Sequence, residues 1–356
     1  MPGKLPEDIA APPFNARTLV HEYGGGALLV RDEQVYFTNF DAGAANLDQR
    51  MHHIDMAAGG SPTAITQPGP YRYADADFDP VRQRLIAVRE DHSADGREPE
   101  NAIVAIGLDG TGTVDLLAGG SDFCAAPRVS PDGSQLAWIR WNHPDMPWTQ
   151  SELWLADIQS AGTLDNPRRI AGGPGQSVML PRWSPGGMLY FVTDQSNWWN
   201  LARFDGAGTE PVAARAAEFG PPAWQLGNSS YDFLSRDRLV CTFAEKGQWR
   251  CGLVDPEDGS LDLLDLPFTS FRAVHAAGDG FVAIAGSPGE AEALVRIDPQ
   301  SGQVDVLRRS IEIPPTVSRY FTVPRAIEFP TGDAQTSHAF YYPPANPDVE
   351  APADEK

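Results

Sequence analysis

Polar turns followed by short apolar runs recur along the whole chain. Each run joins a turn rich in Ser, Pro, Asp or Gly to a few apolar residues, as in SPDGSQLAWI and SPGGMLYFV. A short apolar run bounded by turn residues is typical of a buried β-strand. The apolar positions that anchor the six runs are spaced 42 to 53 residues apart: Val35, Leu85, Leu136, Leu189, Leu239 and Phe281.

A second type of strand follows each of these runs and ends in an aspartate. Segments such as AIVAIGLD and LARFD show the pattern, and a further turn and a short strand usually come next. A carboxylate at a strand end can accept hydrogen bonds from the N–H groups of the next turn, so we expect structural aspartates. They are Asp55, Asp109, Asp157, Asp205, Asp255 and Asp298.

The spacing of the repeat predicts the fold class. A unit of three or four short strands that recurs about every 50 residues is typical of a propeller blade. We therefore predict an all-β fold, a β-propeller of about six to seven four-stranded blades. A seven-bladed type that is incomplete at its N-terminal end fits the six visible units.

The charge balance excludes several classes of partner. The 356-residue chain carries a formal net charge of −21 and contains no basic run. Because nucleic acid and anionic membrane surfaces repel such a chain, we expect neither as a partner. No apolar run reaches the ~18 residues of a membrane helix, and the first residues lack the apolar core of a signal peptide. We therefore expect a cytoplasmic protein.

Cysteine and histidine give no evidence for a cofactor. The three cysteines form no C-x-x-C pair, although Cys241 and Cys251 flank an expected hairpin where a cross-strand disulfide is conceivable. The adjacent His52 and His53 are expected to point to opposite faces of a strand. Because zinc needs three or four converging ligands, we predict no metal site. We also predict no other cofactor.

One serine lies in a motif that resembles a catalytic nucleophile. The stretch AGSPG places Ser287 after an apolar strand, in the small-x-Ser-x-Gly pattern of a nucleophile elbow. An elbow requires a helix after the turn, whereas EAEALVRID continues into the aspartate strand of the repeat. We predict that Ser287 lies at a hairpin connection and that this chain contains no catalytic residue.

The stretch HEYGGG contains three consecutive glycines, but it does not have the pattern of a phosphate loop. A phosphate-binding loop opens a helix, whereas these glycines are followed by ALLV, which predicts a strand. We expect Gly24, Gly25 and Gly26 to form a bulge or a close approach of two backbones.

Several long phrases resemble one enzyme family. RTLVHEYGGGALLV, SPDGSQLAWIRWNHPDMPWTQSELWLAD, WSPGGMLYFVTDQSNWWNLARFD and HAFYYPPANPDVEAP follow one another as in prolyl oligopeptidase family serine peptidases. The branch that the chain most resembles contains dipeptidyl-aminopeptidase- and acylaminoacyl-peptidase-like enzymes. The resemblance covers roughly residues 13 to 352.

The resemblance implies a propeller followed by an α/β-hydrolase domain that carries the Ser-Asp-His triad and hydrolyses short peptides. We expect residues 1–12 to be a flexible N-terminus and 13–316 to be the propeller. Residues 317–344 would be a lead-in hairpin of a missing hydrolase domain, and 345–356 a disordered tail. The expected function is non-catalytic gating of peptide substrates, which would reach the active site of the missing domain.

The resemblance also suggests where substrate binds. In related peptidases, acidic residues on the propeller capture the free amino terminus of the substrate, which makes Glu22 and the adjacent Tyr23 candidates; a purely structural Glu22 is the alternative. For the long loop after WIRW we keep two interpretations open. It either lines the substrate chamber or meets the hydrolase domain, or it only packs on itself. The remaining candidates, from this loop and from SNWWNL, are Trp141, His143, Trp148, Trp198 and Trp199.

A rival interpretation is a stand-alone propeller that binds a protein or peptide partner. The expected hairpin around HAFYYPP argues against it, because a stand-alone binder needs no hydrolase lead-in. Open sheet edges at an incomplete propeller would pair with another strand, so a homo-oligomer is also conceivable.

Overall fold

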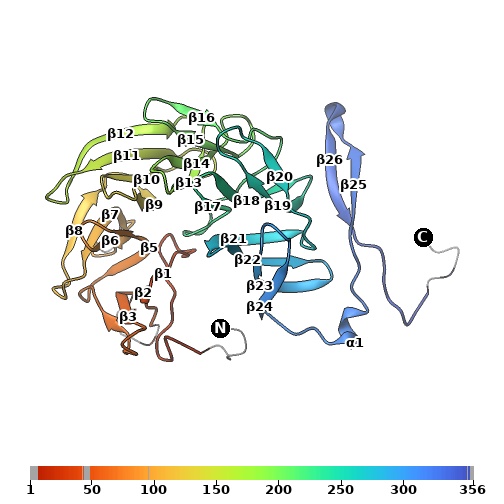
Figure 1. Cartoon of the computed structure of the whole chain (residues 1–356), viewed down its shortest axis with the longest axis horizontal. Coiled ribbons are helices and arrows are strands. Elements are labelled where there is room, and N and C mark those ends of the chain that lie inside the picture. The colour runs from red at the N-terminus through yellow and green to blue at the C-terminus, as the bar shows by residue number, and fades with distance from the viewer. Residues whose placement is uncertain (1–6, 42, 44–48, 95, 351, 353–356) are drawn as a thin grey trace. The chain divides into compact units, whose positions relative to one another are not determined.

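The computed structural model describes residues 7–41, 43, 49–94, 96–350 and 352. Within these residues, six four-stranded antiparallel sheets form the blades of a β-propeller, which confirms the predicted fold class (Figure 1). The segments predicted to be a flexible N-terminus and a disordered tail lie partly outside the described residues, and both remain predictions. No helix among the described residues is long and apolar enough to cross a membrane.

The chain divides into two compact units, which are described separately. The first unit contains residues 1–197, 201–211 and 222–228, and the second contains 198–200, 212–221 and 229–356. The first unit holds blades 1 to 3 and, apart from Asn200, blade 4.

The strands of these four blades follow one another in chain order. Blade 1 consists of β1 (Leu28–Arg31), β2 (Gln34–Thr38), β3 (Met51–Asp55) and β4 (Thr63–Ala64), and blade 2 of β5 (Tyr71–Asp79), β6 (Arg84–Asp91), β7 (Glu100–Gly107) and β8 (Val114–Ala118). Blade 3 consists of β9 (Phe123–Val129), β10 (Gln135–Trp141), β11 (Glu152–Ile158) and β12 (Leu164–Gly172), and blade 4 of β13 (Val178–Trp183), β14 (Leu189–Thr193), β15 (Asn200–Phe204) and β16 (Thr209–Pro211).

The second unit holds two blades and a separate hairpin. Blade 5 consists of β17 (Tyr231–Ser235), β18 (Arg238–Glu245), β19 (Gln248–Val254) and β20 (Leu261–Leu263), and blade 6 of β21 (Ser270–Ala277), β22 (Gly280–Ser287), β23 (Glu290–Ile297) and β24 (Val304–Arg309). A helical turn, α1 (Pro315–Ser318), precedes a pair of strands, β25 (Arg325–Pro330) and β26 (Thr336–Tyr341), joined through the 3-10 turn η1 (Gly332–Ala334).

The apolar runs of the sequence repeat are the second strands of the blades. Val35 is 1% exposed, and the five other anchor positions are fully buried. Each anchor lies on the strand that pairs on both sides within its blade, so its side chain packs into the core between sheets. The repeat in the sequence therefore records a largely buried strand of each blade.

The aspartates at the ends of the third strands accept hydrogen bonds from backbone N–H groups of the following turn, as predicted, with one exception. The Oδ1 atom of Asp205 accepts hydrogen bonds from the N–H groups of Ala207 and Gly208, both at 2.8 Å. Asp55, Asp109, Asp255 and Asp298 also accept backbone N–H bonds in the turn that follows. Asp157 instead accepts bonds from two side chains, those of Gln135 and Asn166.

The first strand of most blades contains a bulge. One residue in each adopts a left-handed conformation: Asp75 in β5, Ala126 in β9, Leu180 in β13 and Ala273 in β21. The register of each strand with its neighbour shifts at the same place. A bulge bends the strand and frees backbone groups from the ladder, so these groups can bond to another blade.

The bulge at Asp75 lets this residue join blade 2 to blade 3 and to the segment before blade 1. Its own N–H donates to the carbonyl of Gly26, before blade 1, at 2.7 Å. Its carboxylate accepts from the Ala126 N–H at 3.0 Å and from the Arg128 guanidinium at 2.8 Å, both in blade 3. The side chain is only 5% exposed. Within the second unit, Asp232 of blade 5 accepts from the Ala276 N–H of blade 6 at 2.9 Å.

Two expectations about cysteine and serine can be compared with the structure. The conceivable disulfide between Cys241 and Cys251 is wrong: both thiols are free and buried, and they lie at adjacent, not paired, positions of β18 and β19. Ser287 ends β22 and pairs with Glu290 at the start of β23, so it lies at a hairpin connection as predicted.

The strand, turn and strand expected near the C-terminal end are present as β25 and β26. All six residues of β25 and all but Ser337 of β26 are exposed. The hairpin therefore presents large apolar side chains to solvent, including Ile327, Phe329 and Tyr341. Its assignment as the lead-in of a hydrolase domain remains a prediction.

We expect Asp75→Ala to lower the free energy of unfolding by about 3 kcal/mol. The change removes a buried carboxylate that faces the Arg128 guanidinium and leaves the Ala126 N–H without its acceptor. Urea unfolding followed by circular dichroism measures the effect. Asp237→Ala, at an exposed position in the turn between β17 and β18, is the control and should leave the midpoint unchanged. Equal stability of the two variants would contradict the role of Asp75.

Candidate functional site

The segment before β1 adopts a strained backbone that turns the His21 side chain inward and the Glu22 side chain to solvent. His21 and Glu22 both have left-handed conformations, with φ of 54° and 61°, which non-glycine residues rarely adopt. The buried Glu90 carboxylate accepts a hydrogen bond from the His21 N–H at 2.7 Å. The Glu22 N–H donates to the Leu19 carbonyl at 2.9 Å. Such strain persists only where the surroundings enforce it, and it is concentrated at functional sites.

The three glycines after Tyr23 allow two distant backbones to touch. A Cβ atom on Gly25 would lie 2.3 Å from the Leu226 carbonyl oxygen, and one on Gly24 would lie 2.2 Å from that of Thr18. Gly25 forms a parallel bridge with Leu226, and the Leu226 N–H donates to the Gly24 carbonyl at 2.9 Å. The predicted close approach of backbones is confirmed, and it joins residues 21–26 to the segment Pro222–Asn228.

His21 anchors the loop from inside. Its Nε2 atom lies 3.0 Å from the Asn101 Oδ1, and its ring meets the rings of Phe123 and Trp141 edge to face at 5.2 and 5.4 Å. Burial lowers the pKa of His21 below its ordinary value, and the nearby Glu90 carboxylate opposes that shift. The ring is therefore kept neutral by its apolar surroundings.

Glu22 presents its carboxylate to solvent above a buried charge network. Its side chain is 75% exposed, and its Oε1 accepts from the Arg72 guanidinium at 2.8 Å. Arg72 also lies 3.7 Å from Glu90, whose side chain is only 3% exposed and which contacts His92 at 3.0 Å. Arg72 thus fixes the orientation of Glu22, while the Oε2 atom of Glu22 has no bonded partner among the described residues.

Three aromatic side chains lie together, the first of them directly after Glu22 in the chain, and we call them the aromatic shelf: Tyr23, Trp148 and Trp224. The Trp224 ring lies 5.1 Å from Tyr23 and 4.3 Å from Trp148. Tyr23 is 57% exposed and Trp224 is 47% exposed. The bridge between Gly25 and Leu226 holds two members of the shelf in place from different parts of the chain.

The structure unites five of the seven candidate residues around this loop. Tyr23 and Trp148 both contact Trp224, and Glu22 directly precedes Tyr23 in the chain. Trp141 is 8% exposed and stacks on Phe123 at 5.0 Å, so it supports His21 and presents little surface to a ligand. His143 is exposed and meets the edge of the same Phe123 ring.

The other two candidates, Trp198 and Trp199, belong to the second unit. The Trp199 N–H donates to the Glu218 carboxylate at 2.7 Å, and its carbonyl accepts from Phe219, so its backbone has a structural role. Trp198 is 41% exposed. The first unit contains neither of them, and their part in substrate binding remains a prediction.

Trp224 and Arg72 are the site residues that sequence reasoning missed. Trp224 lies in PPAWQLGN, an irregular stretch without strand periodicity, and nothing local indicates that it meets residue 23. The one available signal is a large aromatic residue in a connection rich in Pro and Gly, since binding residues are concentrated in loops.

The described residues offer little nucleophilic or metal chemistry. Burial raises the pKa of Cys251 to about 12 and also raises those of Cys124 and Cys241, so none of the three is a reactive thiolate. Ser287 has no hydrogen bond to a histidine among these residues. No group of three or more His, Cys, Asp or Glu residues in the described part of the chain could hold a metal ion.

Comparisons with known proteins add an independent view of the chain. No family model matches it, and no curated protein does. Solved structures do match. A structure from a study of two prolyl endopeptidases has a TM-score of 0.66 at 13% identity, over 88% of this chain and 46% of that one, which shows the fold alone.

Two enzymes that act on puromycin are more similar to this chain than that prolyl endopeptidase structure is. A puromycin-hydrolyzing peptidase of Mycobacterium tuberculosis is 34% identical over 98% of this chain, with a TM-score of 0.87. A puromycin hydrolase is 30% identical over 98% of this chain, with the same TM-score. The chain spans 55% of the length of each of these relatives. Its structural neighbours are therefore peptidases of the prolyl oligopeptidase family, which confirms the resemblance predicted from the sequence.

The neutral, buried state of His21 predicts a dependence of stability on pH. Because the pKa of His21 is lower in the folded protein than the ordinary 6.5, the unfolded chain binds more protons as the pH falls through 6.5. The free energy of unfolding should therefore decrease from pH 8 to pH 5.5. The His21→Gln variant should lose part of this decrease, as measured by urea unfolding at both pH values. The same decrease in the variant and the parent would contradict the assignment.

Proposed function

We propose that this chain is the substrate-selecting propeller of a serine peptidase that hydrolyses short peptides, and that it contributes binding without chemistry. The observation that carries the proposal is the 34% identity with a puromycin-hydrolyzing peptidase over 98% of this chain. The chain spans 55% of that enzyme, so we place the catalytic triad in a hydrolase domain that accompanies the propeller.

The candidate site supports a role in binding the amino end of a substrate. A carboxylate is a suitable partner for an ammonium group, and Glu22 is exposed and already oriented by Arg72. An aromatic side chain next to that ammonium group would lie against the aromatic shelf, where rings gain both buried area and favourable geometry. Tyr23 and Trp224 are also about half exposed, and aromatic rings attract a cationic amine.

Puromycin has the chemistry that this arrangement would select. It carries a free primary amine beside a methoxyphenyl side chain, and two relatives are named for hydrolysing it. We propose that peptides and amides with a free amino terminus and an aromatic first residue bind this propeller. Short peptides of the same kind are then the natural substrates of the whole enzyme.

The rival function, a stand-alone propeller that binds a protein partner, has less support. The similar enzymes are peptidases, and the aromatic shelf with one carboxylate fits a small amine better than a broad protein surface. We further infer a cytoplasmic location, which the three free cysteines support, because a reducing compartment keeps thiols in that state.

Calorimetric titration of the full chain with puromycin tests the binding role. We expect Trp224→Ala to weaken binding about fivefold, since loss of one stacking partner costs about 1 kcal/mol. We expect Glu22→Gln to weaken it about threefold, as for one exposed ion pair. With N-acetylated puromycin, the parent chain and the Glu22→Gln variant should bind equally, because no ammonium group remains.

Two matched variants serve as controls. Glu33→Gln changes an exposed glutamate of blade 1, and Tyr342→Ala removes an aromatic residue that is 59% exposed. Neither should alter puromycin binding. Equal losses in the control and site variants, or binding that ignores Trp224 and Glu22, would contradict the proposed site.

A second measurement tests the absence of chemistry. The chain alone should neither hydrolyse phenylalanine p-nitroanilide nor react with a fluorophosphonate probe. A labelled serine would contradict the proposal, and loss of the label in Ser287→Ala would identify the hairpin serine as a nucleophile after all.

A further inference from the structure

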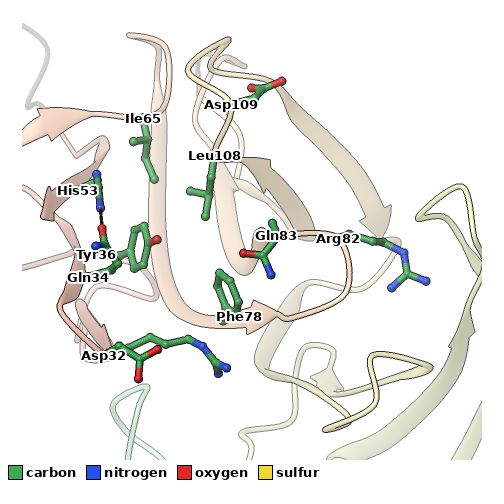
Figure 2. A pocket seen from close by; sticks show the side chains of 11 residues that line it. Asp32, Gln34, Tyr36, His53, Ile65, Phe78, Arg82, Gln83, Leu108 and Asp109 are labelled. Carbon is green, nitrogen blue, oxygen red and sulfur yellow. Dashed lines mark hydrogen bonds between the residues drawn. The ribbon is translucent and has the colours of Figure 1, made fainter.

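A groove of about 740 Å³ opens between blades 1 and 2, away from the aromatic shelf. It lies at the end of the blades where β1 turns into β2 and β5 turns into β6, because Asp32 and Gln83 in those turns line it. The loop that carries Glu22 precedes β1 and so lies at the other end of the same strand. Figure 2 shows the groove between the two blades.

The lining of the groove is mixed: charged and polar side chains predominate, and four apolar or aromatic ones stand among them, Tyr36, Ile65, Phe78 and Leu108. Blade 1 contributes Tyr36, whose ring stacks on that of His53 at 5.0 Å. Blade 2 contributes Phe78 and Leu108, which face Tyr36 across the opening (Figure 2). Phe78, Leu108 and Ile65 belong to the rim of the apolar core that joins the two blades. A flat, apolar group can therefore enter between the two walls.

The Tyr36 hydroxyl is a hydrogen-bond donor that no acceptor of the described residues uses. Tyr36 is 6% exposed, its hydroxyl points toward the groove in Figure 2, and it has no hydrogen-bond partner among the described residues. Burial raises the pKa of Tyr36, and the nearby Arg31 opposes that shift. The phenol thus keeps its proton, and a ligand that places an acceptor at this hydroxyl would gain a hydrogen bond.

Arg31 is the second donor that the protein leaves available. Its guanidinium lies over the Phe78 ring, 4.7 Å from the ring centre, and it has no carboxylate within ion-pair distance in the described part of the chain. Several of the other polar groups of the groove already have partners, although the Nε atom of Arg82 is buried without one among the described residues. His53 bonds to Gln34, the Gln83 amide donates to the Pro80 carbonyl at 2.7 Å, and Arg82 pairs with Asp79 at 3.2 Å.

We propose that this groove binds a small aromatic carboxylate. The ring lies between Tyr36 on one wall and Phe78 and Leu108 on the other, and the carboxylate accepts hydrogen bonds from Arg31 and the Tyr36 hydroxyl. Two carboxylates at the rim, Asp32 and Asp109, oppose any ligand with several negative charges, so phosphate-bearing ligands are excluded. The site is independent of the shelf and of the proposed peptidase role.

Two sources share this ligand chemistry, a simple aryl acid and a free aromatic amino acid. The amino acid also carries an ammonium group, which Asp32 can attract at the rim. Titration of the full chain with 4-fluorophenylacetate and with 4-fluorophenylalanine, followed by fluorine NMR, distinguishes them. Binding of the acid in the ~1 mM range is expected, and tighter binding of the amino acid, lost in Asp32→Asn, would identify the second source.

Variants of the groove test the assignment. Arg31→Gln should weaken binding of 4-fluorophenylacetate about fivefold, and Tyr36→Phe about threefold. Leu108→Trp fills the groove without removing a charge and should abolish binding. Arg97→Gln, an exposed arginine elsewhere in blade 2, should have no effect. Thermal unfolding of each variant shows that the protein remains folded.

Three results would overturn the proposal. One is the absence of any fluorine shift at 10 mM ligand, about tenfold above the expected dissociation constant. Another is equal binding of the neutral 4-fluorophenylacetamide. The third is binding that Arg31→Gln and Leu108→Trp leave unchanged while both variants are folded.

Discussion

The hydrogen bonds of Asp75 are the constraint on which the first unit depends. A left-handed bulge frees its backbone N–H from the ladder of β5, and the N–H bonds to Gly26 while the carboxylate bonds to Ala126 and Arg128. One residue therefore joins the segment before blade 1, blade 2 and blade 3. Because these polar groups are buried, leaving any of them without a hydrogen-bond partner would lower the free energy of unfolding.

The candidate site follows from the same constraint. Gly26, which Asp75 holds, ends the loop that carries Glu22 and Tyr23, and the neighbouring Gly25 touches Leu226. The loop is thus fixed at its glycines from two sides and at His21 from inside. Its exposed side chains are therefore already held in place before a ligand binds, which reduces the entropic cost of binding. The carboxylate that Arg72 orients and the two exposed rings are the features on which the proposed binding role rests.

The sequence predicted the parts of this structure that repeat and missed those that depend on distant contacts. The second strands were found because residues such as Leu136 are fully buried within short apolar runs. The stretch ALLV indicated the first strand of blade 1. The first strands of the other blades were missed because a bulge, as at Ala126, and polar residues such as Asp77 break the alternation that marks a strand. Glu22 and Tyr23 came from the family resemblance. Trp224 could not be predicted, since its place beside Tyr23 depends on a backbone contact between Gly25 and Leu226, which lie far apart in the chain.

The most direct test of the account is amide hydrogen exchange of the full chain, measured by mass spectrometry with and without saturating puromycin. The account predicts slower exchange in two segments, residues 19–27 and 222–228, because ligand contact with Glu22 and Trp224 would stabilise the loop and its bridge. Unchanged exchange in both segments while puromycin is bound, or protection confined to other blades, would contradict the claim that this loop is where the propeller meets its substrate.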